Sequence, residues 1–152
     1  MKKPLNDTKK IQNRRAKFDY DLDDSIVAGL VLNGRETKSL RLGHGHLRGA
    51  YVTVKEGELW LINATITGFS GGQIDEGEHT RARKLLMKKK EIEKLIASKQ
   101  QGKAIVPIEL LTKGRFIKVR IATGKGKKRY DKRQNIKKRE QEREASRSLV
   151  SK

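Results

Sequence analysis

Short runs in which apolar and polar side chains alternate dominate the middle of this chain, and Gly-containing turns separate them. A period of two is typical of antiparallel strands that bury one face. The alternating runs lie at residues 18–22, 26–32, 51–54, 59–62, 105–110 and 117–121. About six such strands in roughly a hundred residues predict a mainly β protein, a small closed or nearly closed antiparallel barrel.

Three dipeptides mark the turns between these runs: Asn33-Gly34, Glu56-Gly57 and Lys113-Gly114. Glycine tolerates the positive φ that tight turns need, so the runs on either side of Glu56-Gly57 are expected to form a hairpin. Pro107 has no amide hydrogen to give to a neighbouring strand. It therefore favours an edge position or a β-bulge within the run 105–110.

Two segments interrupt the β pattern and favour helices. Residues 35–42 are expected to form a short helix that ends at Gly43, because glycine is a common C-terminal cap. Residues 80–101 are expected to form a longer helix, because apolar residues recur there at helical spacing and the other faces are strongly basic. Its apolar stripe consists of Leu85, Leu86, Ile92, Leu95 and Ile96.

Positive charge is the second strong constraint on this chain. The 152 residues include 37 Lys and Arg against 18 Asp and Glu, which gives a formal net charge of +19. Only 34% of residues are hydrophobic, so the core is small and part of the chain lies outside it. A charge this large indicates a polyanionic partner, and contacts of Lys and Arg with nucleic-acid phosphates explain it best.

The charge is concentrated at the two ends, which predicts three parts. Residues 1–17 form a basic N-terminal arm, and residues 18–123 form the folded body. Residues 124–152 carry 12 basic and 4 acidic side chains, a net charge of 12 − 4 = +8, with few apolar groups. We expect this basic tail to be unfolded when free, because it buries too little surface to offset the loss of chain entropy.

Several function classes can be set aside. The chain has no cysteine, which excludes disulfides and thiol chemistry and fits a reducing cytoplasm. The longest uncharged apolar run, 26–32, is far shorter than the roughly 20 residues that span a bilayer. No phosphate-binding glycine loop is present. His44-Gly45-His46 is a weak signal for a metal pair, because no carboxylate is nearby, and an exposed turn is the alternative. We therefore expect neither an enzyme nor a cofactor.

RNA is favoured over DNA as the ligand. No helix-turn-helix, zinc finger or basic zipper is recognisable, whereas small barrels often bind RNA through strands, loops and stacked aromatic rings. Aromatic residues make up only 5% of the chain, so shape and phosphate contacts are expected to dominate.

More specific motifs follow one another along residues 13 to 140. They are Asn13-Arg14-Arg15-Ala16, Ala28-Gly29, Gly34-x-Glu36-x-Lys38-Ser39-Leu40-Arg41-x-Gly43, Tyr51-Val52, Arg81-x-Arg83-Lys84-Leu85-Leu86 and Gly126-Lys127-Lys128-x-Tyr130-Asp131-Lys132-Arg133. With these motifs and spacings the sequence resembles the SsrA-binding protein (small protein B) family. Its members are the bacterial partners of transfer-messenger RNA in ribosome rescue.

The resemblance implies a barrel related to the oligonucleotide-binding fold, with flanking helices, that binds the tRNA-like domain of transfer-messenger RNA. It implies delivery of that RNA to stalled ribosomes for trans-translation, with one monomer per RNA and no catalysis. The small ribosomal subunit and its rRNA are then the second partner. The basic tail is expected to become helical over about 132–149 and to probe the decoding centre and empty mRNA channel.

The matching motifs nominate two sets of site residues. The RNA-binding set is Asn13, Arg14, Arg15, Glu36, Lys38, Ser39, Arg41, Arg83, Lys84, Leu86 and Lys88. The decoding-centre and tail set is Lys127, Lys128, Tyr130, Asp131, Lys132, Arg133, Ile136, Lys137 and Arg139. Two members have a structural alternative, since Glu36 can cap or pair within its own helix and Leu86 can be a core residue.

The chain departs from the family pattern at three places. Val27 stands where an acidic residue is usual, Lys88 stands where Asn or His is usual, and no proline precedes Arg81. The RNA interface is therefore expected to be rearranged near residue 27. The alternatives are a general rRNA-binding or ribosome-assembly protein and, last, an RNA-modifying or RNA-cleaving enzyme that uses the histidines.

Overall fold

The computed structural model describes residues 10–150, without the side chains of residues 129–131, 135 and 147–150. The strands are β1 (Ile11–Gln12), β2 (Tyr20–Leu30), β3 (Gly45–His46), β4 (Tyr51–Lys55), β5 (Glu58–Ile62), β6 (Thr65–Ile66), β7 (Arg83–Leu86), β8 (Ala104–Leu111) and β9 (Lys118–Gly126). The helices are α1 (Ala16–Asp19), α2 (Gly34–Arg41), the 3₁₀ helix η1 (Glu76–Glu78), α3 (Lys89–Gln100) and α4 (Arg129–Val150).

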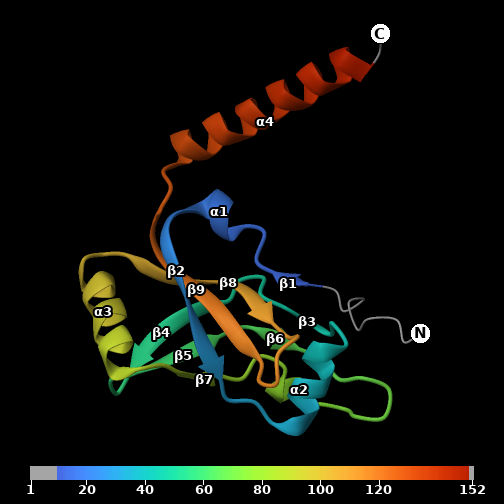
Figure 1. Cartoon of the computed structure of the whole chain (residues 1–152), viewed down its shortest axis with the longest axis vertical. Helices are drawn as coiled ribbons and strands as arrows, with labels where there is room; N and C mark the ends of the chain where they lie inside the picture. The colour runs from blue at the N-terminus through green and yellow to red at the C-terminus, as the bar shows by residue number, and fades with distance from the viewer. Residues whose placement is uncertain (1–9, 151–152) are drawn as a thin grey trace.

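The main sheet closes on itself, which confirms the predicted antiparallel barrel. Its strand order is β1-β8-β4-β5-β7-β2-β9, and an additional pairing of β8 with β9 joins the two ends into a ring (Figure 1). Strands β3 and β6 form a separate two-stranded sheet. Every strand pair is antiparallel.

The predicted hairpin turn and bulge are present, whereas the turn predicted at Asn33-Gly34 is wrong, because Asn33 caps helix α2 and Gly34 is its first residue. Glu56 and Gly57, between β4 and β5, both have positive φ, at 53° and 74°. Two such residues in a row are typical of a two-residue hairpin turn. The pairing of β8 with β9 shifts register between Pro107 and Glu109, so the proline occupies a bulge where its missing amide hydrogen does no harm.

The short helix is confirmed, and its sequence explains where it starts. The Asn33 side chain accepts a hydrogen bond of 2.8 Å from the Glu36 amide, and the Glu36 carboxylate accepts one of 3.1 Å from the Asn33 amide. This reciprocal pair satisfies two amides at the helix start. The chain leaves α2 through Gly43, whose φ is 82°. Leu40 from α2 has no exposed surface and packs in the barrel core.

The helix predicted over residues 80–101 is wrong in its first half. Residues 83–86 form strand β7, and α3 begins only at Lys89. Arg83 and Leu85 point inward and are buried, while Lys84 and Leu86 alternate outward. The inward position 83 holds a charged residue and the outward position 86 an apolar one, so the sequence does not show the alternation of a strand. The segment was therefore mistaken for part of a basic helix. The Leu86 side chain lies outside the core.

The first strand also differs from the prediction. Phe18 belongs to the single turn of α1, and β2 runs without interruption from Tyr20 to Leu30, with a register shift between Leu22 and Ser25 where it pairs with β9. The sheet extends past both expected limits of the folded body, 18 and 123. Ile11 in β1 is 5% exposed, and β9 continues to Gly126.

Helix α4 leaves the barrel beside α1 and projects away from it (Figure 1). The helical conformation agrees with the helix expected in the tail. That this segment is unfolded in the free protein stays a prediction. The division into arm, body and tail likewise stays a proposal. No helix among the described residues is long and apolar enough to cross a membrane.

Candidate nucleic-acid interface

The outward face of β7, β2 and β9 is an exposed strip with an apolar centre. Leu86 is opposite Gly29, and Gly29 is opposite Lys118, so these three residues share one side of the sheet. A Cβ built on Gly29 would lie 3.2 Å from the Leu86 Cβ, so the leucine lies close against the glycine backbone. Leu86 is 54% exposed, and Val27 and Val31 are exposed nearby on β2 and just after it.

Cationic side chains flank this apolar centre. Arg120 is opposite Val27 on the same side of the sheet. It pairs with Glu109 at 2.8 Å, and Lys84 pairs with Glu58 at 2.9 Å. Lys88 and Lys118 are exposed and form no ion pair within the described residues. This surface, hereafter the β7–β2–β9 face, combines free ammonium groups with an apolar patch, which suits a ribose and phosphate surface.

Between α2 and β7 lies an ionic cluster of the buried Glu36 and Arg83 with the partly exposed Arg81. Neither the Glu36 nor the Arg83 side chain is exposed by more than 1%, and their Oε2 and Nε atoms are 2.7 Å apart. Arg81 also donates to Glu36, with its Nε at 3.0 Å from Oε2 and its Nη2 in contact with Oε1. The cluster ties α2 to β7 across a sequence separation of 47 residues.

Arg83 uses its whole guanidinium inside the protein. Its Nε donates to Glu36, and its Nη atoms donate to four backbone oxygens at 2.7–3.2 Å. Those oxygens belong to Ala64, Glu78, His79 and Arg81. An arginine has five N–H donors, so none remains for a phosphate. Arg83 fixes the backbone that leads into β7.

The cluster shifts the pKa values of its members in identifiable ways. Burial raises the pKa of Glu36, but hydrogen bonds from Arg81, from the Asn33 amide and from Arg83 outweigh it and hold that pKa below its ordinary value of 4.5. Burial lowers the pKa of Arg83, and the Glu36 carboxylate partly compensates. A carboxylate with a lowered pKa and a guanidinium remain ionised at neutral pH.

Acid unfolding should report this cluster. Because the folded-state pKa of Glu36 is lowered, its stabilising contribution is complete above about pH 4.5 and is lost as the pH falls through the folded value. We expect the wild-type free energy of unfolding to fall more steeply below pH 4.5 than that of Glu36→Gln. Urea unfolding followed by circular dichroism between pH 2.5 and pH 7 measures both slopes. Equal slopes would mean that Glu36 titrates alike in the folded and unfolded chains.

Three of the residues nominated for RNA contact are therefore placed inside the protein. Glu36, Ser39 and Arg83 have no exposed surface, and a buried side chain cannot meet a phosphate or a base. In this conformation the ionic cluster and the barrel core enclose these three side chains, so their direct contact with RNA stays a prediction. The geometry supports the structural role considered for Glu36, which is to cap the start of its own helix.

The remaining nominated residues divide into structural and exposed groups. The Asn13 side chain donates to the Pro107 carbonyl at 3.0 Å, and Arg41 donates to the carbonyls of Thr112 and Arg115. Both hold backbone in place. The exposed residues from this set are Arg14, Arg15, Lys38, Leu86 and Lys88, with Lys84 partly exposed. The Lys38 ammonium lies 4.9 Å from the Phe69 ring centroid.

Contacts between distant parts of the chain hold the start of α4 against α1, and no sequence pattern predicts them. The Lys127 amide donates to the Asp19 carbonyl at 2.8 Å, and its ammonium donates to the Lys17 carbonyl at 2.9 Å. Lys132 forms an ion pair of 3.1 Å with Asp19. Burial raises the pKa of Asp19, but Lys132 and Arg15 outweigh this and lower it.

Most of the nominated tail residues are exposed along α4 or just before it. These are Lys128, Arg133, Ile136, Lys137 and Arg139. The side chains of Tyr130 and Asp131 lie outside those that the structure describes. Within the described residues, no three His, Asp or Glu side chains form a group that could hold a metal ion.

Comparisons with known proteins give a consistent result. A family model described as "SmpB protein" matches residues 10–151. An SsrA-binding protein of Streptococcus suis is 44% identical over 139 residues, which are 91% of this chain and 90% of that protein. One of Lysinibacillus sphaericus is 43% identical over 142 residues, which are 93% and 92%. A solved chain from "tmRNA-SmpB: a journey to the center of the bacterial ribosome" has a TM-score of 0.65 and 34% identity, covering 79% of this chain and 85% of its own.

Proposed function

The chain belongs to the SmpB protein family, and on this premise we propose that it binds transfer-messenger RNA and brings it to stalled ribosomes for trans-translation. Membership confirms the resemblance drawn from the sequence motifs. The observation that carries the proposal is the likeness, at 34% identity over 79% of the chain, to a protein described with tmRNA on the bacterial ribosome. The protein acts by binding and not by catalysis, in the cytoplasm where ribosomes translate.

The β7–β2–β9 face is our proposed contact surface for the tRNA-like domain. It offers the exposed Leu86 and Val27 to a ribose or base surface, and it offers Lys88 and Lys118 to phosphates. Valine at position 27 removes an acid that would repel phosphate, which supports a more cationic interface than the family pattern. In this proposal Glu36, Arg83 and Arg41 position the surface without contacting RNA.

Helix α4 is our proposed ribosome-binding element. Its exposed cations, including Arg133, Lys137 and Arg139, suit an RNA-lined channel. Tyr130 and Asp131 at its start are proposed to contact the decoding centre. A channel filled with mRNA would exclude the helix by volume and by charge, which restricts the protein to stalled ribosomes.

The proposal is tested by a chain that ends at Gly126, the last residue of β9. We expect this chain to keep its affinity for a transcript of the tRNA-like domain within about threefold, because the barrel and its face are intact, while peptide tagging on ribosomes with truncated mRNA is lost. Filter binding and a tagging assay measure the two properties. Loss of RNA binding together with tagging would contradict the separation of the two surfaces.

The salt dependence of RNA binding tests the charge argument. Each neutralised phosphate is expected to contribute about 0.7–0.9 to the slope of log K against log salt. We expect Lys118→Gln and Lys88→Gln each to reduce this slope by about one phosphate, and Lys94→Gln, an exposed cation on α3, to leave it unchanged. Affinity that barely responds to salt would remove these surfaces from the site.

The identity of the bound RNA separates the proposal from its alternatives. RNA recovered with the protein from cells and sequenced should be enriched in transfer-messenger RNA. Enrichment of rRNA alone would favour a ribosome-assembly role, and turnover of a labelled RNA would favour an enzyme.

A further inference from the structure

An acid at the end of α1 lies where two basic segments meet, and the function proposed above gives it no role. Residues 14–17 contain three Lys and Arg side chains, and residues 127–133 contain five. Like charges at this density repel each other. The acid is Asp19, and it pairs with one cation from each segment.

The topology of the sheet brings these two segments together. Helix α1 ends directly before β2, and α4 follows β9 after two residues. Strands β2 and β9 are antiparallel, and Tyr20 at the start of β2 is opposite Gly126 at the end of β9. The chain therefore leaves β9 where it enters β2, and the first turn of α4 lies beside α1 (Figure 1).

Two contacts fix the chain just before α4 begins. The Lys127 amide donates to the Asp19 carbonyl at 2.8 Å, and the Lys127 ammonium donates to the Lys17 carbonyl at 2.9 Å. Both contacts precede the helix, which starts at Arg129. They hold the connection to the barrel but leave the place of the first helical turn open.

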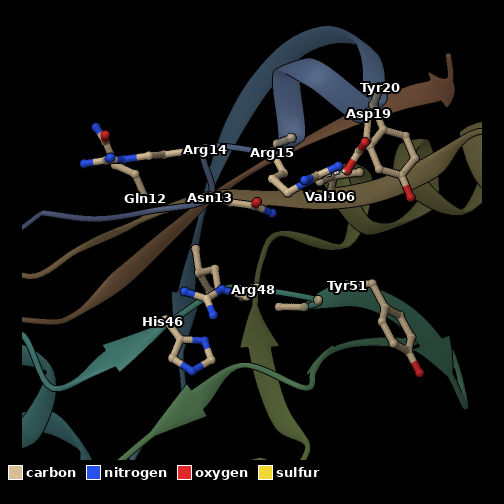
Figure 2. A pocket seen from close by; sticks show the side chains of 14 residues that line it. Gln12, Asn13, Arg14, Arg15, Asp19, Tyr20, His46, Arg48, Tyr51 and Val106 are labelled. Carbon is tan, nitrogen blue, oxygen red and sulfur yellow. Dashed lines mark hydrogen bonds and ion pairs between the residues drawn. The ribbon is translucent and has the colours of Figure 1, made fainter. Parts of the chain in front are cut away.

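A group of side chains holds that first turn. The Asp19 carboxylate is 3.1 Å from the Lys132 ammonium on α4 and 3.5 Å from Arg15, whose guanidinium lies beside it (Figure 2). The Phe18 ring centroid is 5.3 Å from the Arg15 guanidinium and 6.0 Å from the Lys132 ammonium. Cations within about 6 Å of an aromatic ring are attracted to it. Asp19 and Phe18 thus both draw Lys132 toward α1.

We propose that Asp19 is a positioning residue for the tail: it holds the first turn of α4 against α1, so that the ribosome-binding helix starts from one defined place on the barrel. The inference rests on the function proposed above and adds a residue that acts through Lys132, without itself contacting RNA. A helix whose first turn is already in place loses less conformational freedom when it binds. Asp19 therefore strengthens binding to the ribosome without changing the bound state.

The first experiment measures the place of α4 in the free full-length protein. The chain has no cysteine, so Lys94→Cys on α3 and Gln134→Cys on α4, both exposed positions, accept two spin labels. We expect pulsed electron paramagnetic resonance to give a narrow distribution of distances between the labels, which Asp19→Asn broadens. The matched control is Asp24→Asn, which removes an exposed acid on β2 that forms no ion pair within the described residues. It should leave the distribution narrow.

The second experiment measures peptide tagging on ribosomes stalled on truncated mRNA, as a function of the concentration of protein with saturating transfer-messenger RNA. Asp19→Asn should raise the half-saturating concentration by about fivefold, the effect of one partly buried ion pair. The maximal rate should not change, because the bound helix makes the same contacts. Asp19→Glu keeps the carboxylate and should recover most of the loss, and Asp24→Asn should behave as wild type. Thermal unfolding checks that every variant is folded.

Several results would overturn the inference. Equal distance distributions for wild type and Asp19→Asn, whether both narrow or both broad, would show that Asp19 does not hold the helix. A broadened distribution with an unchanged half-saturating concentration would show that its hold has no part in rescue. A lowered maximal rate would instead place Asp19 in the bound complex. If wild type itself gives no tagging, the proposed function fails and the role in rescue fails with it, whereas the distance measurement still shows whether Asp19 holds α4.

Discussion

Glu36→Ala is expected to lower the free energy of unfolding by about 3–5 kcal/mol, because it leaves the buried guanidinium of Arg83 without its anion. The same change removes the carboxylate that caps the start of α2, where it accepts the Asn33 amide. In a domain of ordinary stability, about 5–15 kcal/mol, such a loss unfolds a sizeable part of the population on warming. Urea unfolding followed by circular dichroism measures it.

A surface ion pair provides the matched control. Glu58 and Lys84 are 2.9 Å apart, as close as the buried pair to within a few tenths of an ångström, but their side chains are 43% and 37% exposed. Glu58→Ala should therefore change stability by no more than about 1 kcal/mol. A similar effect of both substitutions would show that burial of the Glu36–Arg83 pair does not determine its contribution.

The double variant Glu36→Gln with Arg83→Met separates charge from hydrogen bonding. Because both charges are removed, no unpaired buried ion is left to destabilise the fold. It does not replace the donors to the carbonyls of Ala64, Glu78 and His79, and an unsatisfied buried acceptor costs about 1–3 kcal/mol. We expect the double variant to remain clearly less stable than wild type.

Proline at both Ile136 and Arg139 should abolish peptide tagging while RNA binding persists. Each proline in a helix interior costs about 3 kcal/mol, or roughly a hundredfold in an equilibrium. Both residues are exposed on α4, so the melting temperature of the barrel should not change. Tagging on ribosomes with truncated mRNA is the measurement, beside filter binding to the tRNA-like transcript.

The matched control for this experiment replaces the same two residues by alanine. Alanine favours a helix, so this variant keeps the helix and loses only two side chains. If the alanine variant fails as badly as the proline variant, the two side chains matter more than the helix. Full tagging by the proline variant would remove the helix from the mechanism.

The sequence predicted the barrel well because its signals are local. The hairpin turn at Glu56-Gly57, the end of the short helix at Gly43 and the bulge at Pro107 each depend on a few neighbouring residues. What sequence could not show is which side of the sheet a motif residue faces.

Arg83 illustrates the limit. An arginine inside a basic motif was expected to meet phosphate, and the partner that buries it, Glu36, is 47 residues away in sequence. Only the fold brings the two together. The one available signal was that Glu36 and Arg83, which carry opposite charges, both belong to family motifs.

Because α4 is held only at its N-terminal end, beside α1, a small rotation there moves its C-terminal end a long way. Its 22 residues extend about 33 Å at 1.5 Å per residue. A rotation of about 10° at the pivot near Lys127 therefore sweeps the far end through about 6 Å, roughly the spacing of neighbouring phosphates along an RNA strand. The Lys132–Asp19 pair is only partly buried and contributes about 1 kcal/mol, so we expect it to permit such rotations. The surface that the helix binds then determines the position of its C-terminal end, and the barrel determines only the position of its N-terminal end.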